Sequence, residues 1–407
     1  MKKTDYSLTI TKIFFTAIVF IISIIFLSCD SSPPPEKAPK PKVVKKKAKP
    51  GKNKKVIKIG VIGAHKGDLS SLGLPALRAA ELAVEKLNAK GGIFSRKIEL
   101  IVEDDSCQPE KAEAAAKKMV ASGVRMVLGH TCSGATRAAL DIYKDANVIA
   151  ISPSATNPAL TEGGDYPNFF RSIAPDDAQA ELQIHLVTDY LKLKKAAMIH
   201  DQDDYGKGLI DYAIDAVKKS GMAEIVLHEE IKSGKDNYSG IIRKIKQSEA
   251  DVVIYGGYHP EASKIVMEMG RRNMKSVFIS GDGAQDAAFI RSAGQYAEGV
   301  YVTGPQDTSR KTLAINAIEL HKKRYNSDPG PFFLNSYAAA LAIFNAIEKS
   351  GSLDYKSISK FLRLSYVATP LGTIHFDKKG DVSGYGFSVY RVQSGKFVEM
   401  NISADKK

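Results

Sequence analysis

The chain has 407 residues, of which 44% are hydrophobic and 25% are charged, so its composition is that of a globular protein with length for two domains. Its net charge of +13 is unevenly distributed, because residues 1–55 hold 13 Lys and Arg but 3 Asp and Glu, a net of +10 that leaves +3 for the remainder. The nearly neutral remainder gives no reason to expect nucleic-acid binding.

The N-terminal residues have the pattern of an export signal. Three lysines precede an uncharged apolar run at residues 13–27, which is shorter than the ~20 residues of a membrane-spanning helix. This pattern predicts a secretory signal peptide at residues 1–28. Cys29 follows Ser28 directly, and the junction resembles the lipobox of bacterial lipoproteins, in which the cysteine is acylated. Phe26 stands where the lipobox usually has leucine, and an ordinary signal peptide with an incidental cysteine is the alternative.

Residues 29–55, beginning at Cys29, are rich in Pro and Lys. Such a segment cannot bury a core and is expected to stay extended as a linker. It would let the globular part stand off a membrane, and its positive charge would attract anionic lipid head groups. A solvated linker without lipid contact is the alternative.

From residue 56 onward, apolar β-branched runs alternate with segments in which apolar residues recur at helical spacing, which predicts doubly wound α/β architecture. The first series has expected strands at 56–62, 97–103, 124–128, 148–151 and 169–172, and helices at 74–88, 110–122 and 136–145. The second has expected helices at 176–191, 207–220, 238–247 and 261–271, and strands at 196–200, 224–230, 252–255, 276–280 and 299–303. The C-terminal part is expected to add helices at 314–325, 333–349 and 355–364, and strands at 372–376 and 387–392.

Clusters of small hydroxyl residues follow two adjacent strands of the first series. Ser133 lies just after the strand at 124–128, and Ser154 and Thr156 lie just after the strand at 148–151. Ligands of such sheets bind outside the carboxyl ends of the strands, and free N–H groups at a helix start favour anions. The three hydroxyls, without a strong base, predict a site that holds a small carboxylate. Helix capping alone is the alternative for each of them.

Two cysteines remain besides Cys29. Cys107 and Cys132 are an even pair, which an exported protein can join in a disulfide. They follow two expected strands that are separated by one helix, so a bridge is feasible if those strands are neighbours. The alternative, two thiols in a metal site, lacks further ligands at metal spacing, and no metal or cofactor is expected.

Taken together, the strand-end loops resemble those of the leucine/isoleucine/valine-binding proteins of bacterial branched-chain amino acid uptake. The likeness extends from about residue 58 to about residue 388, and its order and spacing are specific. Its motifs include Val61-Ile-Gly-Ala64, Asn88-Ala-Lys-Gly-Gly-Ile93, Asp104-Asp-Ser-Cys-Gln-Pro109, Gly129-His-Thr-Cys-Ser133, Ser152-Pro-Ser-Ala-Thr156, Tyr255-Gly-Gly-Tyr-His-Pro-Glu261 and Asp377-Lys-Lys-Gly-Asp381.

The resemblance implies a type I periplasmic binding protein, in which two doubly wound, Rossmann-like α/β lobes are joined by three crossovers and close over the ligand by a hinge. It places lobe 1 at residues 56–174 plus 305–381, and lobe 2 at 175–304 plus 382–407. It also implies a monomeric, non-enzymatic protein of the periplasm or cell envelope. Such a protein delivers an amino acid, here branched-chain or otherwise apolar, to the permease of an ABC transporter.

The resemblance assigns roles to residues of the first series. Ser133, Ser154 and Thr156 would hold the α-carboxylate and part of the ammonium of the ligand. Cys107 and Cys132 would form the disulfide that precedes the site serine. Both assignments agree with the expectation from the strand ends alone.

In the second series, the resemblance implies that Tyr205 and Tyr258 close over the ligand, with core packing as the alternative, and that Asp282 pairs with its ammonium. Two departures from the family stand out, since Asp282 replaces the usual Glu and Leu72 replaces a Tyr or Trp. The shorter Asp282 would act through water or draw the ligand deeper. Leu72 would leave a larger or differently shaped apolar pocket, with Phe332 on the same wall. One methylene is worth only about 1–3 kcal/mol in such a pocket, so these residues predict no ranking among Leu, Ile, Val and Phe.

Other functions were weighed against this one. The same fold could bind an amide, a urea-like molecule, γ-aminobutyrate or an aromatic acid, or it could report a ligand to a membrane receptor. An enzyme is disfavoured, because the chain has no Gly-x-Ser-x-Gly elbow and no phosphate-binding glycine loop. His130 is close to Ser133 in sequence, but a catalytic triad would also need an orienting carboxylate. His130 and His259 are expected to be loop residues rather than metal ligands.

Overall fold

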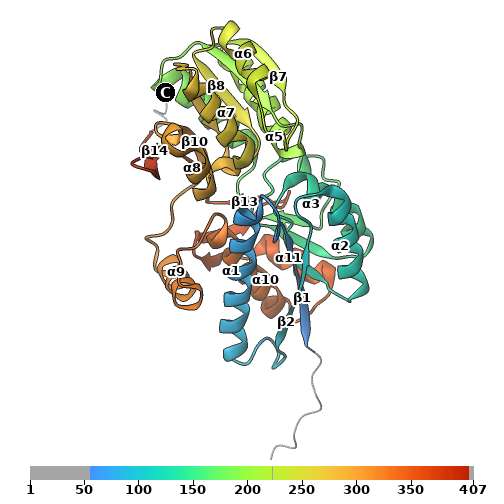
Figure 1. Cartoon of the computed structure of the whole chain (residues 1–407). Coiled ribbons are helices and arrows are strands. Elements are labelled where there is room, and N and C mark those ends of the chain that lie inside the picture. Colours follow the sequence, from blue (N-terminus) through green and yellow to red (C-terminus); the bar gives the residue numbers. More distant parts are fainter. Residues whose placement is uncertain (1–55, 222, 403–407) are drawn as a thin grey trace, which may run out of the picture. The chain divides into compact units, whose positions relative to one another are not determined.

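Two mainly parallel sheets organise the chain in the computed structural model, which describes residues 56–221 and 223–402 (Figure 1). The expected signal peptide at 1–28, Cys29 and the linker at 29–55 lie outside the described residues, as do 403–407 at the end of the expected second lobe. Within the described part, no helix combines the length and the apolar character needed to cross a membrane.

The first sheet has five parallel strands in the order β2-β1-β3-β4-β5. Its central strands are buried because helices cover both faces, whereas the edge strand β2 is half-exposed. Helices α1 and α10 cover one face, and α2 and α3 cover the other. The bounds are β1 (Ile57–Gly63), β2 (Ile98–Asp104), β3 (Met126–Leu128), β4 (Ile149–Ser152), β5 (Phe169–Arg171), α1 (Ser70–Ala89), α2 (Pro109–Ala121), α3 (Ser133–Asp145) and α10 (Phe333–Ser350).

The second sheet has seven strands in the order β15-β14-β10-β9-β8-β6-β7. Strand β14 pairs antiparallel with both of its neighbours, β10 and β15. Helices α4 and α5 cover one face, and α6, α7 and α8 cover the other. The bounds are α4 (Asp176–His185), β6 (Lys195–His200), α5 (Asp204–Ser220), β7 (Glu224–Glu230), α6 (Ser239–Gln247), β8 (Val252–Gly256), α7 (His259–Arg271), β9 (Val277–Ser280), α8 (Ala287–Ala293), β10 (Tyr301–Pro305), β14 (Phe387–Gln393) and β15 (Lys396–Met400).

We call the elements around the first sheet the first lobe and those around the second sheet the second lobe. The first lobe also holds α9 (Thr312–Tyr325), α11 (Tyr355–Leu364) and a small antiparallel sheet of β11 (Val367–Thr369), β12 (Gly372–Phe376) and β13 (Val382–Ser383). The chain passes between the lobes three times, at 172–175, 306–311 and 384–386. The predicted architecture of two Rossmann-like lobes with three crossovers is confirmed.

Several element boundaries differ from the prediction. The helix expected at 176–191 ends at His185 and continues as a π-helix, Leu186–Tyr190. The helices expected from residues 136 and 207 begin earlier, at Ser133 and Asp204, because small and acidic residues fill their first turns. Ser133 and Tyr205 therefore lie in first helical turns and not in the preceding loops. Helix α8 and strands β11 and β15 were not predicted, since each has only three to seven residues.

Candidate ligand-binding site

A narrow cavity lies between the lobes, where strand ends from both sheets face each other. The space between its lining residues, part of which is open to solvent, is about 240 Å³. Seven of the eight predicted ligand-binding residues line it, together with Thr131 and Gly283, and the eighth, Thr156, is fully buried outside this lining. The predicted residues on the lining are Leu72, Ser133, Ser154, Tyr205, Tyr258, Asp282 and Phe332.

Ser133 is the first residue of α3, and the disulfide holds the residue before it. Cys132 is the extended N-cap of α3 and is bonded to Cys107, with the two Cα atoms 5.4 Å apart, so the predicted disulfide is present. The first N–H groups of a helix have no acceptor within the helix. The start of α3 therefore offers hydrogen-bond donors and the positive end of a helix dipole beside the cavity, which suits an anion.

His130 holds the same loop from behind. Its Nδ1 lies 2.6 Å from Asp105 Oδ2, and its Nε2 lies 3.0 Å from Tyr143 Oη, with all three side chains fully buried. Burial raises the pKa of Tyr143 well above its ordinary value. The histidine has the carboxylate partner that the sequence did not reveal, but its other nitrogen contacts Tyr143 and not Ser133. The arrangement is therefore a support for the loop and not a catalytic triad.

Ser154 uses its hydroxyl hydrogen inside the protein. Its Oγ donates to the carbonyl of Thr131 at 2.7 Å, while Ser152 Oγ donates to the carbonyl of His130 at 2.6 Å. A hydroxyl group that already donates its hydrogen still has lone pairs with which to accept another hydrogen bond. Ser154 is thus oriented to accept a hydrogen bond from a ligand rather than to donate one.

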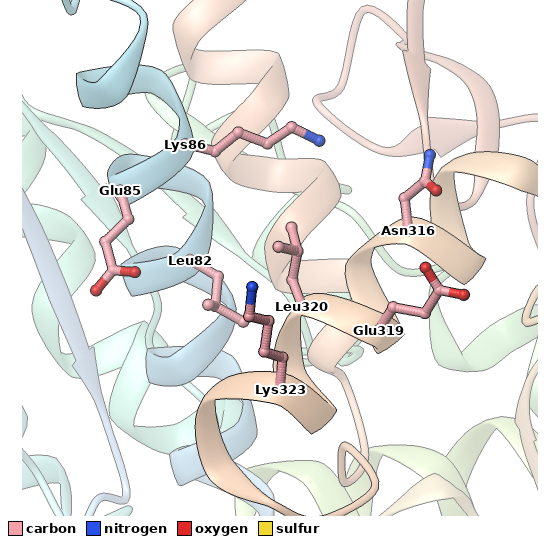
Figure 2. A pocket seen from close by; sticks show the side chains of 7 residues that line it. All are labelled: Leu82, Glu85, Lys86, Asn316, Glu319, Leu320 and Lys323. Carbon is pink, nitrogen blue, oxygen red and sulfur yellow. The ribbon is translucent and has the colours of Figure 1, made fainter.

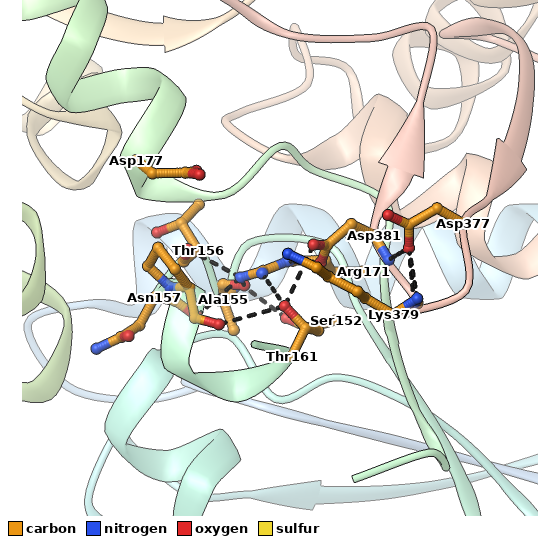
Figure 3. Close-up of polar contacts among 12 residues, drawn as sticks. Ser152, Ala155, Thr156, Asn157, Thr161, Arg171, Asp177, Asp377, Lys379 and Asp381 are labelled. Carbon is orange, nitrogen blue, oxygen red and sulfur yellow. Dashed lines mark hydrogen bonds and ion pairs between the residues drawn. The ribbon is translucent and has the colours of Figure 1, made fainter. Parts of the chain in front are cut away.

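Arg171 clamps the loop that carries Ser154 and Thr156 (Figure 3). This fully buried side chain donates from Nη1 to the carbonyls of Thr156 and Asn157, each at 2.9 Å. Its Nε donates to Asp381 Oδ1 at 2.6 Å. A buried guanidinium needs such partners, and here they fix the backbone behind the cavity.

Asp381 belongs to a tight turn between β12 and β13. The carboxylate of Asp377 closes this turn by accepting the N–H groups of Lys379, Gly380 and Asp381 at 2.8–2.9 Å. The sequence marked the turn only as a motif of the resemblance, and it gave Arg171 no role. The available signal was an arginine at the end of an otherwise apolar strand, where a buried charge requires a distant partner.

Two tyrosines form the second-lobe wall, with ring centroids 5.2 Å apart. Tyr205 Oη donates to Asp282 Oδ1 at 2.7 Å and accepts the N–H of Gly283 at 3.0 Å. Tyr258 Oη donates weakly to Asp203 Oδ1, at 3.4 Å. Both rings pack in the hydrophobic cluster of this lobe, and both also line the cavity. Core packing and contact with the cavity are therefore not exclusive here.

Asp282 shares its buried site with a second carboxylate, Asp176, which the sequence analysis missed. Gln179 Nε2 lies between them, 2.5 Å from Asp176 Oδ1 and 3.2 Å from Asp282 Oδ1. Burial raises the pKa of Asp282 to about 6. Burial, and then the charge of Asp282, raise the pKa of Asp176 well above its ordinary value. Both shifts reflect a site with too little positive charge.

The pair also leaves polar atoms unsatisfied. Thr156 lies near Asp176 and lowers its pKa, yet neither Thr156 Oγ1 nor Asp176 Oδ2 has a partner in hydrogen-bond geometry among the described residues. Buried polar atoms are nearly always paired, and a hydrogen bond from Thr156 to Asp176, which lowers the pKa of Asp176, would pair these two with each other. An acidic residue at the start of a helix is usually explained by its interaction with the helix dipole. For this reason, the sequence alone gave no sign that Asp176 lies beside Asp282.

Comparison with known proteins identifies the family. Residues 56–396 match the family model described as periplasmic binding protein. The chain is a type I periplasmic binding protein. Its relatives are solute-binding proteins rather than enzymes, and they belong to the leucine/isoleucine/valine-binding members of the family.

Two sequence relatives of this binding protein illustrate the similarity. The Leu/Ile/Val-binding protein of Escherichia coli K12 is 33% identical over 334 residues, which cover 82% of this chain and 90% of that one. The leucine-specific-binding protein of Salmonella typhimurium is 34% identical over 340 residues, with the same shares of 82% and 90%. The family predicted from the strand-end motifs is confirmed.

Solved structures agree on the fold. The branched-chain amino acid transporter substrate-binding protein LivJ of Streptococcus pneumoniae, in complex with isoleucine, has a TM-score of 0.76 and 26% identity, covering 85% of this chain and all of that one. A solute-binding protein of Rhodopseudomonas palustris in complex with benzoate has a TM-score of 0.74 at 18% identity, covering 85% and 95%. The latter likeness shows the fold alone.

A larger hollow of this binding protein lies away from the strand ends, between α1 and α9 (Figure 2). It holds about 900 Å³ of space open to solvent. Its lining comes from one face of each helix: Leu82, Glu85, Lys86, Asn316, Glu319, Leu320 and Lys323. The charged groups point along the rim and do not converge on one point, so the smaller interlobe cavity is the better candidate. Nowhere in the described part of the chain do three or more His, Cys, Asp or Glu side chains form a group suited to a metal ion.

Proposed function

We propose that the protein captures an α-amino acid with a branched-chain or other apolar side chain in the interlobe cavity and delivers it to the permease of an ABC transporter. The observation that carries this proposal is the charge pattern of the cavity. Buried Asp282 and the helix start at Ser133 both line the cavity, and a second buried carboxyl group, Asp176, is linked to Asp282 through Gln179. A zwitterion has one charge for each side.

In this proposal, the backbone N–H groups and hydroxyl at Ser133 bind the ligand carboxylate. Asp282 accepts hydrogen bonds from the ammonium, as does Ser154, whose hydroxyl oxygen can accept, whereas Thr156 lies behind this lining. A buried ammonium needs such partners, because an unpaired charge in a dry cavity is strongly unfavourable. Gln179 donates to the carboxyl groups of both Asp176 and Asp282 and so holds them in place.

Apolar residues supply the remaining wall. Leu72 and Phe332 come from the first lobe, and Tyr258 comes from the second. They suit an aliphatic side chain, and the relatives are named for leucine, isoleucine and valine. A ligand without an ammonium, such as benzoate, would leave the Asp176–Asp282 pair without a cation. An α-amino acid is therefore favoured over such a ligand.

We further propose the cellular setting from the sequence. Residues 1–28 direct export, acylated Cys29 anchors a monomer to a membrane of the cell envelope, and residues 29–55 act as the spacer. The lobes are proposed to span 56–174 plus 305–381 and 175–304 plus 382–407. Metabolic labelling with a palmitate analogue should mark the wild type and not Cys29→Ala; equal labelling of both would contradict the anchor.

A thermal-unfolding panel tests the ligand class. It would include the twenty amino acids, their amides, γ-aminobutyrate, urea and benzoate. A ligand at ~100 times its Kd stabilises the folded protein by ~2.7 kcal/mol. We expect shifts with leucine, isoleucine or valine. A folded protein that responds to benzoate or amides, and to no amino acid, would refute the proposal.

A further inference from the structure

The lobes also meet outside the cavity, where the start of α3 faces the start of α5. Asp204, the first residue of α5, forms an ion pair between its Oδ2 and Arg137 Nε of α3. The backbone carbonyl of Asp204 accepts a hydrogen bond of 2.6 Å from Asn157 Nδ2. Arg137 and Asn157 belong to the first lobe and Asp204 to the second. Both interactions therefore exist only while the lobes are together.

Small residues allow this close approach. A Cβ at Gly208 of α5 would stand 2.6 Å from Asn157 Nδ2, and a Cβ at Gly134 of α3 would touch the side chains of Asp203 and Asp204. A larger side chain at Gly208 would push Asn157 away and separate the two helices. The contact between the lobes therefore depends on close approach at two glycines and not only on long side chains.

The charges of the two helix starts are complementary. The N-terminus of α3 carries the positive end of its dipole and is followed by Arg137, and it faces the carboxylates of Asp203 and Asp204. The side chains of Arg137 and Asp204 are 37% and 34% exposed, so solvent screens the ion pair in part. Neither residue lines the cavity.

The interface is nevertheless attached to the cavity on both sides. Asn157 directly follows Thr156, and its backbone N–H donates to Ser133 Oγ at 3.3 Å. Asp204 directly precedes Tyr205, which binds Asp282. A ligand that orders Ser133 and Tyr205, which both line the cavity, would therefore also order the groups that meet across the lobes.

We propose that Arg137, Asn157 and Asp204 form a latch that stabilises the closed arrangement of the lobes and so sets ligand affinity without touching the ligand. Its bonds form only on closure, so they raise the population of the closed state. They act on the rate of ligand dissociation more than on association, because the ligand enters before the lobes close. The part concerning affinity rests on the proposed function, whereas the part concerning closure does not.

A charge-swap cycle on the full-length protein tests the latch. The variants are Arg137→Asp, Asp204→Arg and the double swap. Small-angle X-ray scattering without ligand reports closure, and stopped-flow dissociation of L-leucine reports affinity. We expect each single swap to give a more open scattering curve or about tenfold faster dissociation, and the double swap to return within about threefold of the wild type. Single swaps without effect on either measurement, or a double swap no better than the singles, would overturn the latch.

Two further variants separate the latch from general stability. Arg272→Asp breaks a pair of similar exposure at the C-terminal end of α7, where Arg272 Nη2 lies 2.7 Å from Glu268 Oε1, and it should leave scattering and dissociation unchanged. Gly208→Val should open the protein through bulk alone. The same opening in Arg272→Asp, or a closed Gly208→Val protein, would overturn the proposal. If the wild type binds no amino acid in the thermal-unfolding panel, the proposed ligand class is wrong, and scattering alone then decides the latch.

Discussion

The two sides of the cavity are built in opposite ways. On the first-lobe side, Ser133, Ser154 and Thr156 are held by bonds that the protein completes by itself, through the disulfide, through His130 and through Arg171. On the second-lobe side, Asp282 and its neighbour Asp176 are buried with raised pKa values and too little positive charge.

The first-lobe side is preorganised, whereas the second-lobe side lacks a cation for its buried carboxylates. The first-lobe side costs little when the cavity is empty, because the hydroxyls of Ser152 and Ser154 and the guanidinium of Arg171 already have partners. The second-lobe side is destabilising until a cation arrives, since buried carboxylates are unfavourable without one. We therefore infer that the ligand ammonium, more than its carboxylate, provides the free energy that favours closure.

The largest expected effect comes from removing the charge on the second-lobe side. Asp282→Asn should weaken binding of the amino acid at least 100-fold, since breaking a buried ion pair costs about 3–5 kcal/mol. The ligand-free variant should be as stable as the wild type or more so, because one buried charge is gone. Titration calorimetry and thermal unfolding measure the two quantities. Asp286→Asn, whose carboxylate caps α8, is the matched control and should keep the affinity. Wild-type affinity in Asp282→Asn would remove Asp282 from the ammonium site.

Acid should act on the same group. The pKa of Asp282 is about 6 in the folded protein against an ordinary value of 3.8, so the folded state binds the extra proton between these values. The stability of the ligand-free protein should therefore rise as the pH falls from about 6 to about 4. Affinity should move the other way, because the ammonium needs the ionised carboxylate, and Kd should rise by up to tenfold for each pH unit below about 6. Calorimetry at pH 7.5, 6.0 and 5.0, by thermal unfolding for stability and by titration for Kd, tests the direction of both changes. Asp282→Asn should show no such trend, and a wild-type Kd independent of pH would contradict this account.

On the first-lobe side, breaking the clamp should harm stability and binding together. Asp381→Asn removes the charge opposite the buried Arg171 and loosens the loop whose carbonyls Arg171 holds. We expect a lower Tm and about tenfold weaker binding. Asp354→Asn, at the exposed N-cap of α11, is a control that should alter Tm slightly and binding not at all. A variant with lower Tm but unchanged affinity would show that the clamp supports the fold and not the site.

The contrast between the two sides also marks what the sequence could predict. The hydroxyl residues Ser133, Ser154 and Thr156 could be predicted to lie near one another because each follows a strand, and strand ends of a parallel sheet meet at one edge; of the three, Ser133 and Ser154 line the cavity. The resemblance extended the prediction to Tyr205, Tyr258 and Asp282. All of these signals are local in the sequence, as is the alternation of strands and helices that predicted the fold.

The missed residues act over long distances in the chain. Arg171 and Asp381 are separated by 210 residues, and Asp176 and Asp282 are joined through Gln179, 103 residues before Asp282. Neither periodicity nor a local motif predicts which buried charged residues pair with each other in the folded protein. Such pairs depend on how the lobes and crossovers pack, and only the structure supplies that.

The disulfide offers a milder test of the first-lobe side. Cys107→Ala with Cys132→Ala opens a link that spans 25 residues and should cost about 3 kcal/mol of stability. Because His130 and Ser152 still hold the loop, we expect binding to weaken only several-fold. Thermal unfolding and calorimetry of the double variant measure both effects. Loss of binding in a folded variant would mean that the disulfide, and not the hydrogen bonds, positions Ser133.

The smallest effect is expected at the apolar wall of the cavity, because this wall does not contact the charged groups of the ligand. Leu72 is buried against the cavity, and Leu72→Trp adds bulk to a space of about 240 Å³. We expect a few-fold loss for leucine and little loss for alanine, so that the preference between them narrows. Leu72→Met, which nearly conserves volume, is the control and should keep the wild-type ranking. Competition calorimetry with the two amino acids measures the ranking. If Leu72→Trp leaves it unaltered, Leu72 does not contact the ligand side chain, and the apolar wall belongs to Phe332 and Tyr258 alone.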